Sequence, residues 1–129
     1  MRILLDTSVL IDVLRPRHGR RELLAELARA GHFLVTTSLN VAEVYAGMRP
    51  GEEPQTAAFL DALECYELTR TAGRVAGRLK NEWSKKGRTL TLADTIIGAI
   101  ALERGYTLMT DNRKDFPMAE LQCYSLPDA

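Results

Sequence analysis

The sequence is poor in the residues that zinc and redox sites use. It has two cysteines and two histidines, in no spacing typical of a zinc site. Any metal chemistry must therefore use oxygen ligands. Cys65 and Cys123 each precede a tyrosine in a strand-like segment, and we expect both to be small core residues and not to form a disulfide.

Net charge and long apolar runs are lacking as well. Seventeen acidic residues balance seventeen Lys and Arg, so any contact with a polyanion must use local patches. No apolar stretch reaches the roughly 18 residues of a membrane span, and the first residues lack a signal-peptide pattern. We therefore expect a cytoplasmic protein with no membrane contact, and a single domain over residues 1–129.

Strand-like and helical patterns alternate along the chain. The strand-like runs are short and apolar, and they cover Arg2–Leu5, Phe33–Thr36, Cys65–Leu68, Thr107–Met109 and Gln122–Leu126. Helical patterns cover Ser8–Leu14, Arg20–Ala30, Ser38–Met48, Gln55–Leu63, Thr71–Lys86 and Leu92–Arg104. This alternation predicts an α/β fold with a mainly parallel sheet and helices on both faces, in which ligands bind at the carboxyl ends of the strands.

Acidic residues stand at several of these strand ends. Asp6 interrupts the apolar run "ILLDTSVLID", where an unpaired buried carboxylate would be costly, so we expect it just past the strand and beside a partner. Glu43 lies in the otherwise apolar helix of "NVAEVYAG", and Asp94 lies in the first turn of the apolar helix of "LADTIIGAIALERG". The alternatives are a surface Glu43 near a helix start and a capping box from Thr91 to Asp94.

A further polar cluster follows the run Thr107–Met109. The segment "TDNRKDF" places Asp111, Asn112 and Asp115 within about one turn. Capping of a short helical turn is the alternative explanation for this cluster. A parallel sheet would nevertheless bring all these acids to one edge, where they would repel one another without a cation. The economical partner is Mg²⁺ or Mn²⁺, which prefer oxygen ligands.

Taken together, "LLDTSVLID", the Glu of "NVAEVYAG" and "LADTIIGAIALERGYTLMTDNRKDF" resemble the PIN-domain ribonucleases, specifically the VapC-type toxins of toxin–antitoxin pairs. The resemblance covers Ile3 to Phe116. It implies an α/β/α sandwich on a sheet of about five strands. The catalytic and metal-binding positions that it implies are Asp6, Glu43, Asp94 and Asp115, with Asp111 and Asn112 as weaker candidates for the fourth place and supporting hydroxyls at Thr7 and Thr110.

The resemblance also implies a function and partners. The activity would be Mg²⁺- or Mn²⁺-dependent endoribonuclease cleavage by the toxin of a type II, VapBC-like system. A small VapB-like antitoxin would occupy the acidic cleft, and the chain would form a homodimer. The alternative is a non-catalytic RNA-binding or interaction module with a PIN-like fold.

RNA would have to be held by local positive charge. The candidate residues are Arg15, Arg17, Arg74, Arg78 and Arg88. For each of them a solvated helix face is the alternative explanation. Trp83 falls on the apolar side of its helix, and we expect it to be a core residue and not a platform for base stacking.

Overall fold

A four-stranded parallel sheet forms the centre of the structure, a computed structural model that describes residues 1–127. Its order is β3-β2-β1-β4. The strands are β1 (Arg2–Leu5), β2 (Phe33–Thr37), β3 (Glu64–Tyr66) and β4 (Thr107–Met109). The parallel sheet of the sequence analysis is confirmed, but the strand count of about five is wrong.

The expected fifth strand, residues 122–126, makes only one bridge to the sheet. Within it, Cys123 pairs with Leu108, whose N–H donates to Gln122 O at 2.8 Å and whose carbonyl accepts from Tyr124 N at 2.7 Å. Because β4 has only three residues, it offers this segment too few partners for a longer ladder.

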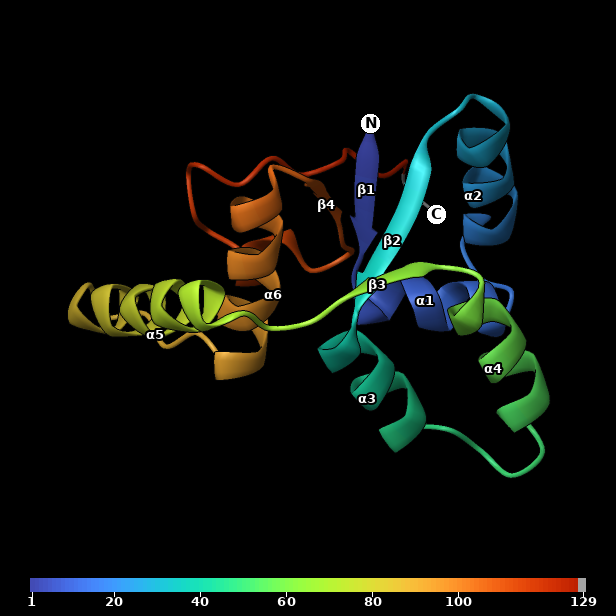
Figure 1. The fold of residues 1–129 in the computed structure, drawn as a ribbon, viewed down its shortest axis with the longest axis horizontal. Helices are drawn as coiled ribbons and strands as arrows, with labels where there is room; N and C mark the ends of the chain where they lie inside the picture. The colour runs from blue at the N-terminus through green and yellow to red at the C-terminus, as the bar shows by residue number, and fades with distance from the viewer. Residues whose placement is uncertain (128–129) are drawn as a thin grey trace.

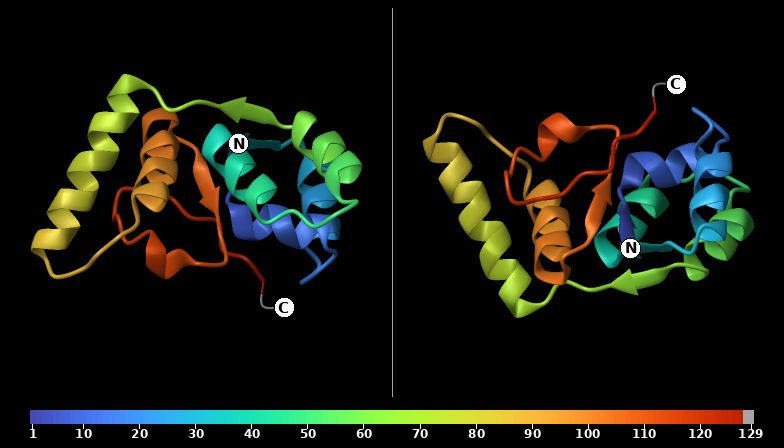
Figure 2. Two further views of the ribbon diagram at one scale, coloured as in Figure 1. Left: turned by 90° about the horizontal axis from the view of Figure 1, so that it is seen from below. Right: turned by 90° about the horizontal axis from the view of Figure 1, so that it is seen from above.

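Within residues 1–127 six α-helices cover the sheet, and they lie within two residues of the bounds expected from the sequence. They are α1 (Thr7–Leu14), α2 (Arg20–Arg29), α3 (Ser38–Ala46), α4 (Glu53–Asp61), α5 (Arg70–Lys85) and α6 (Leu92–Arg104). The two faces of β1 separate two cores, because side chains alternate along a strand. Ile3 and Leu5 pack with α1, α2 and α4, whereas Leu4 packs with α5 and α6. The views of Figure 2 show these two helical layers, which make the fold an α/β/α sandwich.

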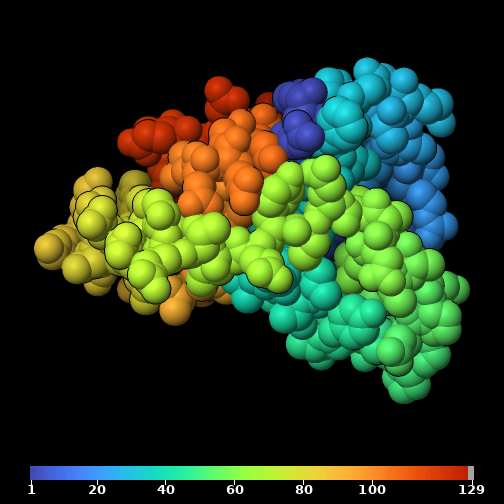
Figure 3. All heavy atoms as spheres, viewed as in Figure 1, coloured from blue at the N-terminus to red at the C-terminus, as the bar shows by residue number. Residues whose placement is uncertain are grey.

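The cysteine prediction is wrong for Cys65. Its side chain is exposed because β3 is an edge strand that pairs only with β2, and Figure 3 shows this segment running across the surface. Cys123 is half-buried against the core beneath α5 and α6, and both thiols are free. Trp83 packs against the same core, as expected from its helical position.

The direction of the strands fixes where a site can form. In Figure 1, β1 and β2 point towards the end of the sheet at which α1, α3 and α6 begin. The helices within residues 1–127 are all too short or too polar to cross a membrane.

Candidate metal-binding active site

Asp6 lies between the end of β1 and the first residue of α1. Its backbone N–H donates to Met109 O of β4 at 2.9 Å, and its carbonyl accepts from the first turn of α1. The side chain makes no capping hydrogen bond to α1 and is 6% exposed. Instead, Oδ2 accepts from the hydroxyl of Thr110 at 2.7 Å. Asp6 is therefore a buried carboxylate oriented by a neighbouring strand end, and its side chain does not serve as a helix cap.

Asn40 is a central residue of the site that the sequence analysis did not assign. It is fully buried in the first turn of α3, and its Nδ2 donates to Asp6 Oδ1 at 3.3 Å and to Thr7 Oγ1 at 3.0 Å. Thr37 fixes the amide, because its hydroxyl donates to Asn40 Oδ1 at 2.6 Å while accepting from Asn40 N. The available signal was a second polar residue, three positions before Glu43, in an apolar helix.

Glu43 joins the same network from α3. Its Oε1 accepts from the hydroxyl of Thr7 at 2.6 Å, and the carboxyl group is partly buried. Thr7 thus bridges the amide of Asn40 and the carboxylate of Glu43. The alternative was a surface glutamate near a helix start, whereas Glu43 is partly buried and lies beyond the first turn of α3.

Asp94 approaches from the other helical layer. Thr91 caps α6 by accepting from Asp94 N at 3.1 Å, so the expected cap is present. The carboxyl group of Asp94 is partly buried and lies near Glu43 and Asp115. Asp115 ends the 3₁₀ turn η1 (Arg113–Asp115) after β4. Asp94 therefore does both things: its backbone N–H takes part in the helix cap, and its carboxylate lies with the other acidic residues.

Electrostatics link the four carboxylates into one group. Burial is the main cause that raises the pKa of Asp6, with the charges of Asp94 and Glu43 adding to it and the Thr110 hydrogen bond opposing it. Burial likewise raises the pKa of Asp94, and the charges of Asp115 and Glu43 add to that effect. Within residues 1–127 no Lys, Arg or His forms an ion pair with any of the four.

The weaker candidates for the fourth position lie differently. Asp111 accepts from Nη2 of Arg20 at 2.8 Å, and its carboxylate is therefore already neutralised. Asn112 is exposed, and its backbone N–H donates to Thr110 Oγ1 at 3.0 Å. Of the three residues in this segment, Asp115 is the one whose charge acts on Asp94.

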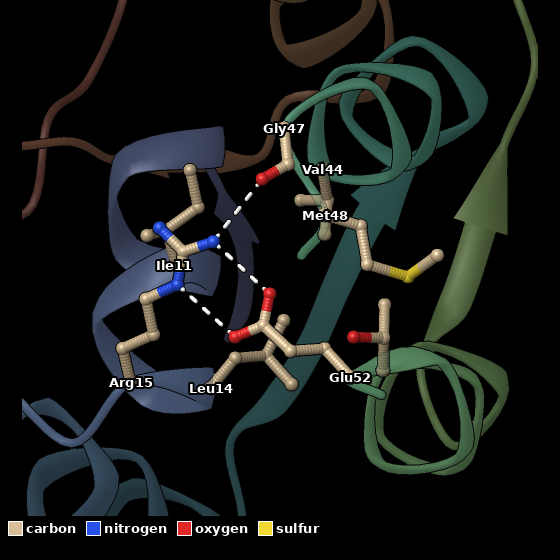
Figure 4. A pocket seen from close by; sticks show the side chains of 8 residues that line it. Ile11, Leu14, Arg15, Val44, Gly47, Met48 and Glu52 are labelled. Carbon is tan, nitrogen blue, oxygen red and sulfur yellow. Dashed lines mark hydrogen bonds and ion pairs between the residues drawn. The ribbon is translucent and has the colours of Figure 1, made fainter. Parts of the chain in front are cut away.

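The arginines proposed for RNA differ in their availability. Figure 4 shows Arg15 held by both carboxylate oxygens of Glu52, at 3.3 and 3.1 Å, and by Gly47 O at 3.1 Å. Arg15 and Glu52 line a small pocket of about 20 Å³ between α1 and the α3–α4 connection. The other candidates, Arg17, Arg74, Arg78 and Arg88, are all exposed.

The donor set suits a hard divalent cation. Asp6, Glu43, Asp94 and Asp115 offer only oxygen, the ligand type that Mg²⁺ and Mn²⁺ prefer. In the part of the chain that is described, no three acidic, His or Cys side chains already stand close enough to hold an ion between them. The four residues are thus neighbours whose mutual repulsion a cation would offset.

The fold and this acidic group define an α/β/α protein with a candidate oxygen-ligand metal site. The chain belongs to the PIN domain family, which matches residues 3–120. It is similar to ribonuclease VapC19 of Mycobacterium tuberculosis, with 32% identity over 115 residues that cover 89% of this chain and 92% of that protein. It is also similar to ribonuclease VapC2 of Haemophilus influenzae, with 27% identity over 121 residues and 90% of each chain covered.

Solved structures agree on the fold. VapBC2 from Rickettsia felis, bound to a DNA fragment from their promoter, superposes with a TM-score of 0.83 at 24% identity and covers 96% of this chain and 98% of that one. A toxin–antitoxin complex from Klebsiella pneumoniae gives 0.80 at 22% identity, with 98% and 99% covered. The resemblance to this family noted in the sequence is confirmed.

Proposed function

We propose that this protein is a metal-dependent endoribonuclease of the VapC type that acts as the toxin of a toxin–antitoxin pair. The observation that carries the proposal is the convergence of Asp6, Glu43, Asp94 and Asp115 at the carboxyl edge of the sheet, with no cation paired to them within residues 1–127. Four carboxylates without such a partner destabilise a fold, so their presence favours a chemical role. The similarity to two ribonucleases supplies the substrate class.

The residues would divide the work as follows. Asp6 and Asp94, whose pKa values are raised by burial, would hold Mg²⁺ or Mn²⁺, with Glu43 and Asp115 completing the oxygen set. When bound, the ion would polarise a phosphate oxygen and acidify a water. Thr110, Asn40 and Thr7 would keep Asp6 and Glu43 in fixed orientations through the hydrogen bonds already described.

Two partners belong to the same proposal. Several structural neighbours are toxin–antitoxin complexes, which supports a small VapB-like antitoxin as a partner. We propose that the tail of this antitoxin fills the acidic cleft. A basic side chain of such a tail would neutralise the carboxylates as a metal ion does. We also propose a homodimer, and a monomer at micromolar concentration in light scattering would contradict it.

The experiment uses end-labelled single-stranded RNA and the matching DNA. Wild-type protein is incubated with each in Mg²⁺, in Mn²⁺ and in chelator, beside an Asp94→Asn variant whose folding is checked by circular dichroism. Asn at this position keeps its backbone N–H for the cap from Thr91. We expect metal-dependent cuts in RNA that the variant does not make.

Other outcomes have distinct meanings. Cutting of DNA alone would change the substrate class and leave the metal site intact, since a metal reads phosphate and not sugar. Cleavage that persists in chelator would contradict the proposed metal dependence. Binding of RNA without cutting, and without any metal effect on thermal stability, would favour the non-catalytic module.

A further inference from the structure

A second pocket adjoins the acidic group through Thr110. This residue donates its hydroxyl to Asp6 and also lines a pocket of about 530 Å³. The other walls come from the first two turns of α1, the loop between α1 and α2, the turn after β4 and residues 125–127. Figure 2 shows the C-terminal segment passing close to this end of α1. A ligand in the pocket would therefore lie next to whatever Asp6 binds.

Charged side chains of both signs line this pocket, unlike the acidic group. Asp12 Oδ2 lies 2.8 Å from His18 Nδ1, and Asp111 Oδ1 accepts from Arg20 at 2.8 Å. A free cation would meet Arg20 and Arg113, and a free phosphate would meet two carboxylates. This balance favours a ligand without net charge that both donates and accepts hydrogen bonds.

His18 provides a fixed aromatic surface at this pocket. Its backbone is left-handed, with φ of 57°, a region that few residues other than glycine adopt. Its side chain is 47% exposed, and the hydrogen bond from Nδ1 to Asp12 restrains the ring. Imidazole rings stack on unpaired bases in RNA-binding proteins. The ring is therefore restrained at the wall of the pocket, with nearly half of the side chain exposed.

Hydrogen-bonding groups complete the lining. Arg20 is 3% exposed and donates to Asp111 and to two backbone carbonyls, those of His18 and Pro127. Its Nε is the buried side-chain nitrogen for which residues 1–127 provide no partner. The amide of Asn112 and the hydroxyl of Ser125 stand at the exposed rim. Of these groups the exposed Asn112 amide and Ser125 hydroxyl can reach the edge of a nucleobase, while Arg20 is buried in the wall.

We propose that this pocket binds one base of the RNA next to the phosphodiester bond cleaved at Asp6, and so selects the nucleotide beside the cut. The inference rests on the proposed ribonuclease function. Its volume, its stacking surface at His18 and its balanced charges carry it, and Thr110 supplies the link to the acidic group.

The test compares His18→Asn with His32→Asn. Asparagine tolerates the left-handed backbone of position 18 but removes the aromatic ring. His32 lies at the opposite end of the sheet, where its Nδ1 is 3.2 Å from the N-terminal amine, so the same substitution there is a matched control. An Arg113→Gln variant, at an exposed lining residue, reports on phosphate contact independently.

The first readout does not need catalysis. Adenosine, guanosine, cytidine and uridine, and separately inorganic phosphate, are titrated in chelator while amide resonances are followed by NMR. We expect at least one nucleoside to bind in a roughly millimolar range and to shift His18 and Asn112, and His18→Asn to lose this while His32→Asn keeps it. Binding of phosphate alone, or nucleoside binding unchanged in His18→Asn, would overturn the proposal.

The second readout is cleavage of RNAs that carry an abasic site on either side of the mapped cut. One of the two should slow wild-type cleavage by roughly tenfold or more, the size expected for one lost stack. The same abasic site should barely slow His18→Asn, which has already lost the stack. An equal penalty in both proteins would contradict the pocket. A wild type that cuts no RNA would contradict the ribonuclease, and the nucleoside titration would still decide whether the pocket takes a base.

Discussion

The carboxylates around the end of β1 fall into two groups with opposite electrostatics. Asp6, Glu43, Asp94 and Asp115 gather with no basic partner within residues 1–127, and burial raises the pKa of two of them. Three other carboxylates each have a basic partner, as Asp12 has His18, Asp111 has Arg20 and Glu52 has Arg15. Carboxylates close together in the sequence, such as Asp6 and Asp12, can therefore differ in whether they destabilise or stabilise the folded state.

This difference separates chemistry from architecture. Paired carboxylates tie loops to helices, as Glu52 ties the α3–α4 connection to α1 in Figure 4. Unpaired buried carboxylates cost stability, and a fold keeps them only for a use such as holding a cation. The same Asp→Asn change should therefore have opposite effects on stability in the two groups.

The largest expected effect is on activity, at Asp6→Asn. Removing this proposed ligand should lower RNA cleavage by at least about 100-fold, since a metal contributes several kcal/mol to the transition state and each 1.36 kcal/mol is about tenfold. The melting temperature at pH 7 should stay the same or rise, because the variant no longer buries a carboxylate disfavoured by its surroundings. Cleavage rates and calorimetry on one preparation measure both quantities, and a variant that melts earlier yet still cuts would remove Asp6 from the site.

The matched change Asp111→Asn should act on stability. It leaves the guanidinium of Arg20, which is 3% exposed, without its counter-charge. We expect the free energy of unfolding to fall by about 1–3 kcal/mol, as when one partner of a partly buried pair is neutralised. Urea denaturation gives this value. Asp111→Asn as stable as the wild type would mean that the pairing of Asp111 with Arg20 does not support the fold.

Some residues of the acidic group could be predicted from the sequence, and others could not. Asp6, Glu43 and Asp94 could be placed at one edge because alternating strands and helices fix a parallel sheet, whose strand ends share that edge. The parallel order was confirmed by the pairing of β1 with β2 and β4. Asn40 escaped assignment because its role depends on side-chain directions that only the crossing of α1 and α3 determines.

The paired group could not be predicted for a similar reason. Arg20 and Asp111 are 91 residues apart, and Arg15 and Glu52 are 37 apart. No local period links residues so distant, so Arg15 looked like a candidate for RNA and Asp111 like a possible ligand. The prediction of a fifth strand was wrong because of the length of β4. The apolar pattern of residues 122–126 was present, but β4 was too short to pair with it.

Mg²⁺ should bind the unpaired carboxylates and not the paired ones, and this binding should raise the melting temperature. At ten times its Kd an ion adds about 1.4 kcal/mol of stability to a protein that binds it only when folded. Wild type should therefore melt at a higher temperature in Mg²⁺ than in chelator, and Asp6→Asn should show a much smaller shift. Asp111→Asn should keep the full shift, because its carboxylate is already neutralised by Arg20. A shift lost in Asp111→Asn would place that residue among the ligands.

The smallest effect on stability is expected for Glu52→Gln. Its dependence on pH should be opposite in sign to that of Asp6→Asn. Arg15 holds the pKa of Glu52 below its usual 4.5, so the carboxylate stabilises the folded state at neutral pH and loses this contribution as pH falls through its folded pKa. Asp6 has a raised pKa, so its cost to the fold is greatest at neutral pH and fades as pH falls towards that pKa. At pH 7, Glu52→Gln should lower the melting temperature by no more than about 2 °C, because the ion pair is accessible to solvent.

Melting curves recorded from pH 7 down to pH 4 compare the two variants with the wild type. The wild type should be slightly more stable than Glu52→Gln at pH 7 and approach it in acid. It should be no more stable than Asp6→Asn at pH 7, and any gap between them should close as Asp6 takes up its proton. If both variants diverged from the wild type in the same direction across this range, the carboxylates could not be divided by pairing, and their placement at the sheet edge would no longer indicate a cation site.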